Sequence, residues 1–365
     1  MNRRKFVSGL GASSAAGAAL TSCGSEENGA GTQERKRIRW KLASSYPRSL
    51  DTIYGFAEKM ATRVAQLTDG FFEIEVYPAG ELVPGGEVMD AVSGGGVEIG
   101  HTAAYYYKGK HPALAFETAV PFGLTARQQN AWLNQAGGLE LMNEILAQFN
   151  IKSFAGGNTG QQMGGWFRKE INSLQDLQGL VMRIPGLGGE IMDRLGVTVQ
   201  VLQGGEVYPA LERGAIDAAE WVGPYDDQKL GFWQVAKNYY YPGWWEPGAN
   251  ISIYVNKTFW EELPTSYQAA LEAACAESSS TMLESYDAKN PQALQELIEK
   301  GVNLRPFSAD IMAAAEKESE KLHAELAASN SDYKRVYEHW KAFKEASSQW
   351  FSTAEQSYAN HAFQR

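Results

Sequence analysis

An arginine at the end of a predicted strand is the first residue whose position could do chemistry. Arg183 closes a short apolar run, residues 180–184, and precedes Pro185, a glycine-rich segment (186–189) and a predicted helix from Glu190. A guanidinium beside a helix N-terminus suits a carboxylate, because it can bind both oxygens while the helix dipole adds positive potential. We therefore predict that Arg183 binds a carboxylate ligand. The alternative is an arginine in a structural ion pair.

Two glutamates occur in aromatic segments. Glu220 is followed by Trp221, and Glu246 follows Trp244 and Trp245. Two carboxylates in such surroundings cannot both stay buried and charged without a counter-charge. A cation between them would satisfy both, an all-oxygen set suits Na⁺ or Ca²⁺, and residues 158–167 offer a neutral amide. The alternative is that each glutamate is an ordinary solvated carboxylate.

Sequence patterns typical of catalysis are missing. The chain has no G-x-S-x-G, P-loop or H-E-x-x-H pattern, and the glycine-rich segment 186–189 lacks the last spacing of a dinucleotide-binding motif. There is no C-x-x-C pair, and the five histidines are scattered, so we do not expect a zinc site. These observations favour a binding protein, with a secreted enzyme on the same framework as the competing hypothesis.

An internal repeat suggests how the candidate residues are brought together. Residues 85–98 align with 204–217, and six of the 14 positions are identical. Each copy predicts a short helix, a glycine in the left-handed region and then a strand, which implies two domains of like topology. Residues 101–106 would then mirror 220–225. Because ligands of open α/β sheets bind at the carboxyl ends of strands, both segments are candidate parts of one cleft, and Tyr105 is included on this ground.

Short β-type runs alternate with amphipathic helices from Ile38 onward, which predicts an α/β fold with parallel sheets. The predicted strands are 38–43, 71–76, 99–103, 181–184, 215–222, 251–255 and 302–307. The predicted helices are 52–67, 267–287, 292–300, 309–328 and 334–359.

The N-terminus has the features of an export signal. Residues 2–7 contain the twin arginines Arg3 and Arg4, a short apolar run follows, and Leu20-Thr21-Ser22-Cys23 resembles a bacterial lipobox. We expect a twin-arginine lipoprotein signal over 1–23, lipid on Cys23, and a polar tether over 24–37. Cys275 is then the one remaining cysteine; it lies in a predicted helix, and we expect a buried thiol.

Length and charge limit the possible classes. The chain has 365 residues, which suggests two domains, with 44% hydrophobic and 21% charged residues, as in an ordinary globular protein. Its formal charge is −10, and loss of the basic signal leaves 30 basic against 43 acidic residues. Nucleic acid is therefore not an expected partner, because binding phosphate backbones needs clustered Lys and Arg.

Three sequence blocks together resemble the solute-binding subunit of tripartite ATP-independent periplasmic (TRAP) transporters, the DctP family. The blocks are Arg183-Ile184-Pro185-Gly186, residues 205–218 and residues 220–227. With residues 240–246 they are similar to the branch that binds 2-oxo and 2-hydroxy monocarboxylates together with a metal ion. The resemblance runs from about residue 38 to 359. It implies a type II-like, two-domain periplasmic binding protein with a hinge, a ligand cleft and long C-terminal helices.

The resemblance also implies roles for individual residues. Arg183 would pair with the substrate carboxylate, and Gln162 would contact both substrate and metal. Glu220, Glu246 and the main-chain carbonyl of Trp221 would hold the ion, which bridges to the substrate. The branch pairs into homodimers through a long C-terminal helix, for which residues 334–359 are the candidate.

Domain boundaries, ligand and ion complete the expectations. We expect domain I at 38–155 and 249–290, domain II at 156–248 and 291–330, and the C-terminal helix at 331–365. The expected function is capture of a pyruvate-like 2-oxo acid in the periplasm for the small and large membrane subunits of a TRAP transporter. Charge balance favours Ca²⁺ but the resemblance favours Na⁺, which we expect. Lactate with calcium, dicarboxylates or sugar acids, and a sensory role remain alternatives.

Overall fold

Two mixed β-sheets form the framework of the body that begins at Arg37, and the computed structural model describes residues 35–363. The first sheet has the order β2-β1-β3-β10-β4, and the second the order β11-β9-β5-β8-β6-β7. The strands of the first sheet are β1 (Ile38–Ser44), β2 (Phe72–Tyr77), β3 (Ile99–Thr102), β4 (Ile151–Asn158) and β10 (Asn250–Asn256). Those of the second are β5 (Trp166–Phe167), β6 (Val181–Arg183), β7 (Thr198–Gln200), β8 (Ala218–Ala219), β9 (Asn238–Tyr241) and β11 (Asn303–Pro306).

Most predicted strands are present, but the prediction that both sheets are parallel was wrong for one strand in each. β10 is antiparallel to β3 and β4, and β5 is antiparallel to β8 and β9. Both strands directly follow a connection that carries the chain from one sheet to the other, so no strand–helix–strand crossover sets their direction. The predicted strand at 215–222 is only the short β8, and β4, β5, β7 and β9 were not predicted.

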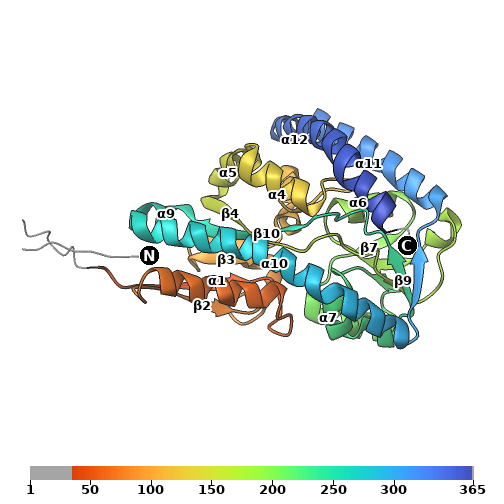
Figure 1. Cartoon of the computed structure of the whole chain (residues 1–365), viewed down its shortest axis with the longest axis horizontal. Coiled ribbons are helices and arrows are strands. Elements are labelled where there is room, and N and C mark those ends of the chain that lie inside the picture. Colours follow the sequence, from red (N-terminus) through yellow and green to blue (C-terminus); the bar gives the residue numbers. More distant parts are fainter. Residues whose placement is uncertain (1–34, 364–365) are drawn as a thin grey trace, which may run out of the picture. The chain divides into compact units, whose positions relative to one another are not determined.

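The helices pack around these sheets (Figure 1). They are α1 (Ile53–Leu67), α2 (Val88–Ser93), α3 (Ala115–Thr118), α4 (Ala126–Gln135), α5 (Gly138–Leu146), α6 (Gly186–Arg194), α7 (Gly204–Glu212), α8 (Pro224–Leu230), α9 (Lys257–Glu262), α10 (Thr265–Glu299), α11 (Ala309–Ser329), α12 (Ser331–Phe351) and α13 (Ser357–Ala362). A π-helical turn, Ser352–Gln356, joins α12 to α13, so the predicted C-terminal helix is interrupted once.

The longest helix, α10, contradicts the prediction of two separate helices. Pro291 lacks an N–H and normally breaks a helix, which is why a break was expected there. The helix nevertheless continues, because it is buried on both sides of the proline. Leu271 and Cys275 pack in the core beside α1, whereas Tyr286 and Leu297 pack in a second core beneath α7 and α8. Figure 1 shows α10 passing from α1 toward α7.

The two copies of the repeat have the same local structure. Gly95 and Gly214 occupy equivalent positions, and both have positive φ values, of 72° and 69°. After each glycine, two successive amides bond to one equivalent carbonyl, of Ala91 in the first copy and of Ala210 in the second. The strands that follow, β3 and β8, each lie between one parallel and one antiparallel neighbour.

Gly85, the first residue of the first repeat copy, lies against Gln203, the residue before the second copy. A Cβ atom placed on Gly85 would lie 2.9 Å from Oε1 of Gln203 and 2.8 Å from the carbonyl oxygen of Ser45. Gln203 caps α7, where its side chain and that of Glu206 form a capping box. Glycine at position 85 therefore permits the close approach of segments from the two sheets.

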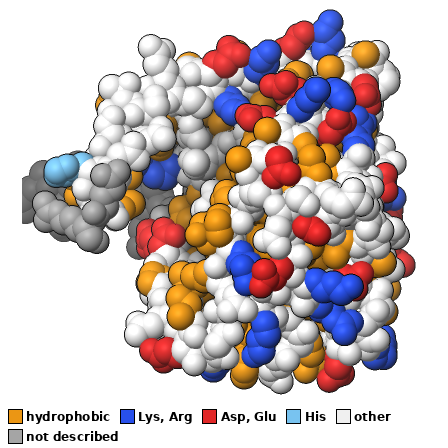
Figure 2. Space-filling model, turned by 90° about the vertical axis from the view of Figure 1, so that its right-hand side faces the viewer, with side chains coloured by type: hydrophobic (Ala, Val, Ile, Leu, Met, Phe, Trp, Pro, Cys, Tyr) orange, Lys and Arg blue, Asp and Glu red, His pale blue; other side chains and the backbone are white. Residues whose placement is uncertain are grey.

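The C-terminal helices expose large aromatic side chains. Trp350 is 63% exposed, Tyr358 70% and Phe363 82%. Elsewhere on the surface, on the face seen in Figure 2, basic and acidic side chains are interspersed rather than gathered in one field. None of the described helices combines the length and the apolar character needed to cross a bilayer. The predicted signal segment, Cys23 and most of the tether lie outside the described residues.

Candidate functional site

The predicted site residues converge on one small cavity between the two sheets. The side chains leave about 10 Å³ there, which is room for roughly one water molecule. Its walls come from the carboxyl ends of β1, β3, β4 and β6, and from the segments around β8 and before β10. The lining residues are Tyr46, Ile53, Tyr105, Tyr106, Thr159, Gln162, Arg183, Trp221, Val222, Glu246, Ala249 and Ile251. Glu220, the remaining predicted residue, contacts Arg183 directly beside this cavity.

Arg183 is the one arginine or lysine among the lining residues, and it is buried. Its Nη1 atom donates to the main-chain oxygen of Glu220 at 2.7 Å and to the side-chain Oε1 of the same residue. Nε donates to the carbonyl of Leu202 at 3.1 Å, and the guanidinium lies 4.8 Å from the ring centroid of Trp221. Arg183 is thus held in place by protein oxygens, and the ion pair that the sequence left as an alternative is present. The ligand clamp stays a prediction.

The glycines after Arg183 allow α6 to begin against the site. Gly186 has φ +67°, and a Cβ atom there would lie 3.4 Å from the ring of Tyr105. At Gly188 a Cβ atom would lie 2.6 Å from Cβ of Trp245. The glycine-rich segment therefore serves close packing of a helix end against two aromatic side chains of the site.

The two glutamates are buried close to one arginine. Burial raises the pKa of Glu220 well above its ordinary value, although Arg183 opposes this effect. Burial likewise raises the pKa of Glu246 to about 7, again opposed by Arg183. Burial would lower the pKa of Arg183, but the carboxylate of Glu220 and other nearby groups more than reverse this, and the net shift is upward. With both carboxylates ionised, the site would hold two negative charges against the single positive charge of Arg183.

Several buried oxygen atoms of the site have no hydrogen-bond donor. Oε2 of Glu220 and Oε1 of Gln162 have no partner within hydrogen-bonding distance. Glu246 accepts one bond, from the hydroxyl of Tyr105 at 3.3 Å. Oxygen atoms left in this way are the ligands that a hard cation needs, so the residues fit a Na⁺ or Ca²⁺ ion.

The donor set is mixed rather than a carboxylate cluster. The residues that the structure describes contain no group of three or more His, Cys, Asp or Glu side chains arranged to hold a metal. Two carboxylates, an amide oxygen and a main-chain carbonyl are instead the available ligands. A set of oxygen atoms alone does not suit a soft metal. It suits a hard cation that can also bind an oxygen atom of the captured solute.

Gln162 and Glu246 are joined through the main chain. The amide of Gln162 donates to the carbonyl of Glu246 at 3.3 Å, and the carbonyl of Gln162 accepts from the amide of Gly243 at 3.0 Å. The side-chain nitrogen of Gln162 donates to the hydroxyl of Thr159 at 3.0 Å, which turns its oxygen toward the cavity side. A shift of either residue would therefore move the other.

The sequence did not single out Tyr46, Tyr106 and Thr159, which also line the cavity. Tyr46 follows the end of β1, and Tyr106 lies in the segment that the repeat had already marked. The strand-end rule that supported Tyr105 could therefore have found both. Burial raises the pKa of Tyr106 to about 12, so its hydroxyl is a neutral hydrogen-bond donor for a ligand.

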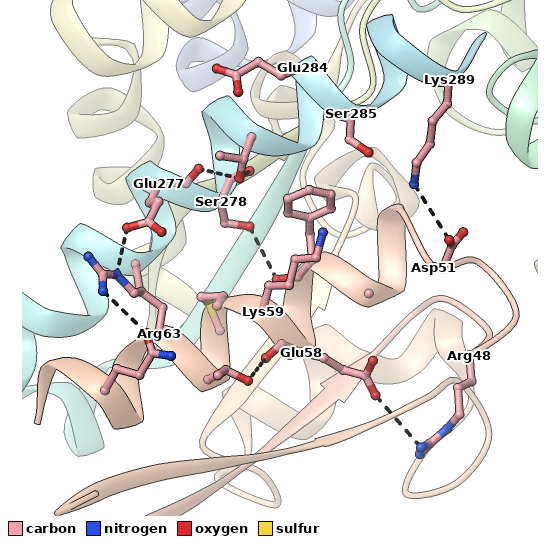
Figure 3. A pocket seen from close by; sticks show the side chains of 17 residues that line it. Arg48, Asp51, Glu58, Lys59, Arg63, Glu277, Ser278, Glu284, Ser285 and Lys289 are labelled. Carbon is pink, nitrogen blue, oxygen red and sulfur yellow. Dashed lines mark hydrogen bonds and ion pairs between the residues drawn. The ribbon is translucent and has the colours of Figure 1, made fainter. Parts of the chain in front are cut away.

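The most voluminous hollow is a different one, between α1 and α10 (Figure 3). Several of its charged side chains are paired with one another, including Arg63 with Glu277 at 2.8 Å and Lys289 with Asp51 at 3.7 Å. This groove is open to solvent and lacks buried, unpaired polar atoms. We therefore place the candidate site in the smaller cavity.

Comparison with known proteins identifies the family. Residues 43–330 match the model of the DctP family, described as bacterial extracellular solute-binding proteins, family 7. The chain belongs to this family. Its members are substrate-binding receptors, so this DctP-family protein is a periplasmic receptor of the TRAP class and not an enzyme.

Three similar proteins bear names that describe a ligand. A monocarboxylate 2-oxoacid-binding periplasmic protein of Nostoc sp. is 52% identical over 360 residues, which is 99% of each chain. A TRAP solute-binding protein of Bordetella bronchiseptica, solved with calcium and picolinate, is 51% identical with a TM-score of 0.89, over 90% of this chain and 98% of the other. One from Pseudoalteromonas atlantica, with sodium and pyruvate, is 38% identical with a TM-score of 0.87, over 89% and 99%.

Proposed function

We propose that this DctP-family protein captures a small 2-oxo monocarboxylate such as pyruvate, together with a metal ion, and delivers it to the membrane subunits of a TRAP transporter. One observation carries the proposal: a small cavity holds Arg183 beside two buried carboxylates and side-chain oxygen atoms without donors. A carboxylate ligand supplies the partner for the guanidinium, and the ion supplies the partner for the oxygen atoms.

The charges of the lining residues favour a monocarboxylate over a dicarboxylate. Arg183 is the only arginine or lysine among them, and it is already shared with Glu220. A second carboxylate of the ligand would meet Glu246 and tyrosine hydroxyls rather than a cation. Lactate, which differs from pyruvate in one hydroxyl, is the second candidate.

In our proposal Arg183 binds the ligand carboxylate, and Gln162 contacts both ligand and ion. Glu220, Glu246 and the carbonyl of Trp221 hold the ion, and Tyr105 donates to Glu246 and faces the ligand. Two carboxylates and the ligand carry three negative charges and Arg183 returns one, so Ca²⁺ neutralises the site, whereas Na⁺ leaves one negative charge. We propose Na⁺, because pyruvate and sodium occupy the similar protein of Pseudoalteromonas atlantica, and treat Ca²⁺ as the alternative.

The organisation of the chain supports a hinged, two-domain receptor. Strands β1–β3 and β10 of the first sheet fall within 38–155 and 249–290, and all strands of the second fall within 156–248 and 291–330. We propose these segments as domains I and II. We further propose homodimers through α12 and α13, whose exposed Trp350 and Tyr358 would be covered, and a lipid anchor on Cys23 after twin-arginine export.

Thermal unfolding tests ligand and ion together. The mature protein is heated with pyruvate, lactate or succinate, each with Na⁺, Ca²⁺ or a chelator. Ligand at about 100 times its dissociation constant adds about 2.7 kcal/mol of stability, which gives a clear shift. We expect an ion-dependent shift with pyruvate. A shift with succinate alone, or one that a chelator and Na⁺-free buffer leave intact, would contradict the proposed site.

A further inference from the structure

A lysine of the C-terminal helix is linked to Glu246, one of the two glutamates of the site, through Phe122 and Trp244. Lys344 lies on α12 and is half-buried against the segment that precedes α4. Its Nζ atom donates to the carbonyl oxygen of Phe122 at 2.6 Å and lies 5.3 Å from the ring centroid of Trp340. A single main-chain carbonyl is thus the hydrogen-bond acceptor found for a half-buried ammonium group.

Phe122 has a backbone conformation that needs support. Its φ value is +53°, in the left-handed region that bulky residues rarely adopt. Both of its main-chain polar groups are engaged: the carbonyl accepts from Lys344, and the amide donates to the carbonyl of Trp244 at 2.7 Å. Its ring also stacks on that of Trp244, with centroids 5.1 Å apart and an interplanar angle of 15°. Lys344 and Trp244 therefore hold Phe122 from opposite ends.

Trp244 is the second residue of the turn that presents Glu246 to the cavity. The amide of Trp244 donates to the carbonyl of Pro242 at 3.0 Å, and the amide of Glu246 donates to the carbonyl of Gly243 at 3.2 Å. The Trp244 ring also packs edge-on against Trp245, with centroids 4.8 Å apart. Fixing the carbonyl and the ring of Trp244 therefore fixes a central residue of a tight turn whose fourth residue is the candidate ion ligand.

We propose that Lys344 and Phe122 are positioning residues for Glu246, so that the C-terminal helix α12 sets the ion affinity of the cleft. This inference rests on the proposed function, because it takes Glu246 as an ion ligand. Residues that hold metal ligands in place typically alter metal affinity about 10- to 100-fold when they are replaced. The contact of Lys344 reaches Glu246 through Phe122 and Trp244, so we expect the lower end of that range.

Replacement of Lys344 by methionine is the test. Lys344→Met keeps the apolar stem and removes the donor, whereas Lys344→Arg keeps a charged donor and should restore affinity. Lys341→Met is the matched control: it removes the same charge one turn earlier, from an exposed side chain whose ion pair with Glu345 is 4.0 Å long. Two readouts are compared: ion affinity at saturating pyruvate, and amide hydrogen exchange of Phe122 and Glu246 in ion-free protein.

We expect the dissociation constant of the ion to rise about tenfold in K344M and to stay within about twofold of wild type in K341M. Amide exchange at Phe122 and Glu246 should quicken in K344M alone. Unchanged ion affinity in a folded K344M variant, with an ion-dependent wild type, would overturn this inference only. A wild type whose pyruvate binding is independent of ions would overturn the proposed function and this inference with it. Should K344M not fold, Phe122→Ala replaces it, because it removes the ring that stacks on Trp244. Weaker ion binding with faster exchange at Glu246 supports the inference, and a variant indistinguishable from wild type in both contradicts it.

Discussion

Nη1 of Arg183 contacts both the main-chain oxygen and the side-chain oxygen of Glu220, so the proposed ligand clamp and a proposed ion ligand form one unit. Neither can move or be replaced without affecting the other. Because both side chains are buried, removal of the arginine would leave an uncompensated carboxylate inside the protein.

This pairing predicts two separable effects of replacing Arg183. Arg183→Met should abolish pyruvate binding and also lower the free energy of unfolding by about 3–5 kcal/mol, the usual cost of breaking a buried pair. The double variant with Glu220→Gln should recover much of the stability but none of the binding. Chemical denaturation and titration calorimetry on the four proteins of this cycle provide the measurement. Micromolar binding by either variant without Arg183 would remove it from the ligand site.

Glu246→Gln should weaken ligand binding in an ion-dependent way. The glutamine side chain keeps the shape of the glutamate and can still accept from the hydroxyl of Tyr105. It removes one negative charge from the groups proposed to hold the ion. Pyruvate affinity measured across added Na⁺ and Ca²⁺ should therefore lose its steep dependence on the ion. Tyr105→Phe serves as control, because it removes the hydrogen bond to Glu246 and leaves the charge. Identical ion dependence in E246Q and wild type would exclude Glu246 as a ligand.

The buried carboxyl of Glu117 should make stability fall as the pH rises. Three hydroxyl groups, of Ser153, Ser252 and Tyr254, contact it, and burial raises its pKa from 4.5 to about 7. The folded state therefore binds this proton more tightly than the unfolded state, and stability is lost between about pH 4.5 and pH 7.

Comparison with Glu117→Gln isolates this effect. The variant should gain roughly 3 kcal/mol relative to wild type between the two ends of that range, since one pKa unit corresponds to about 1.4 kcal/mol. Denaturant unfolding of both proteins from pH 4.5 to pH 8 provides the measurement. Other buried carboxyls, including Asp226 and Asp227, titrate in both proteins and cancel in the difference. Parallel curves would show that Glu117 does not titrate in this range.

Ion pairs between segments of the two sheets should slow ligand release. Lys108, after β3, pairs with Glu190 of α6, and Asp51, before α1, pairs with Lys229 of α8. Exposed pairs contribute about 0–1 kcal/mol each, so combining K108M with K229M should speed release only a few-fold. Stopped-flow tryptophan fluorescence measures this rate. Arg39→Met, which breaks a pair within the first sheet, is the control and should leave the rate unchanged.

The sequence predicted which residues line the cavity better than it predicted the strands and their directions. Arg183 ends a strand beside a glycine-rich helix start, and Gly95 and Gly214 mark equivalent turns, because these features depend on local geometry. The direction of β10 and the short strand β5 depend on where the chain crosses between sheets, which no local pattern encodes. Pro291 was misleading for a related reason: buried contacts on both sides of it, far apart in sequence, keep α10 continuous.

The contacts of Gly85 decide what a side chain at this position would disturb. A Cβ atom there would lie 2.8 Å from the carbonyl oxygen of Ser45 and 2.9 Å from Oε1 of Gln203. The glutamine side chain can turn away, whereas the carbonyl of Ser45 belongs to the main chain that follows β1. Alanine at position 85 would therefore strain the short segment that carries Tyr46 into the cavity.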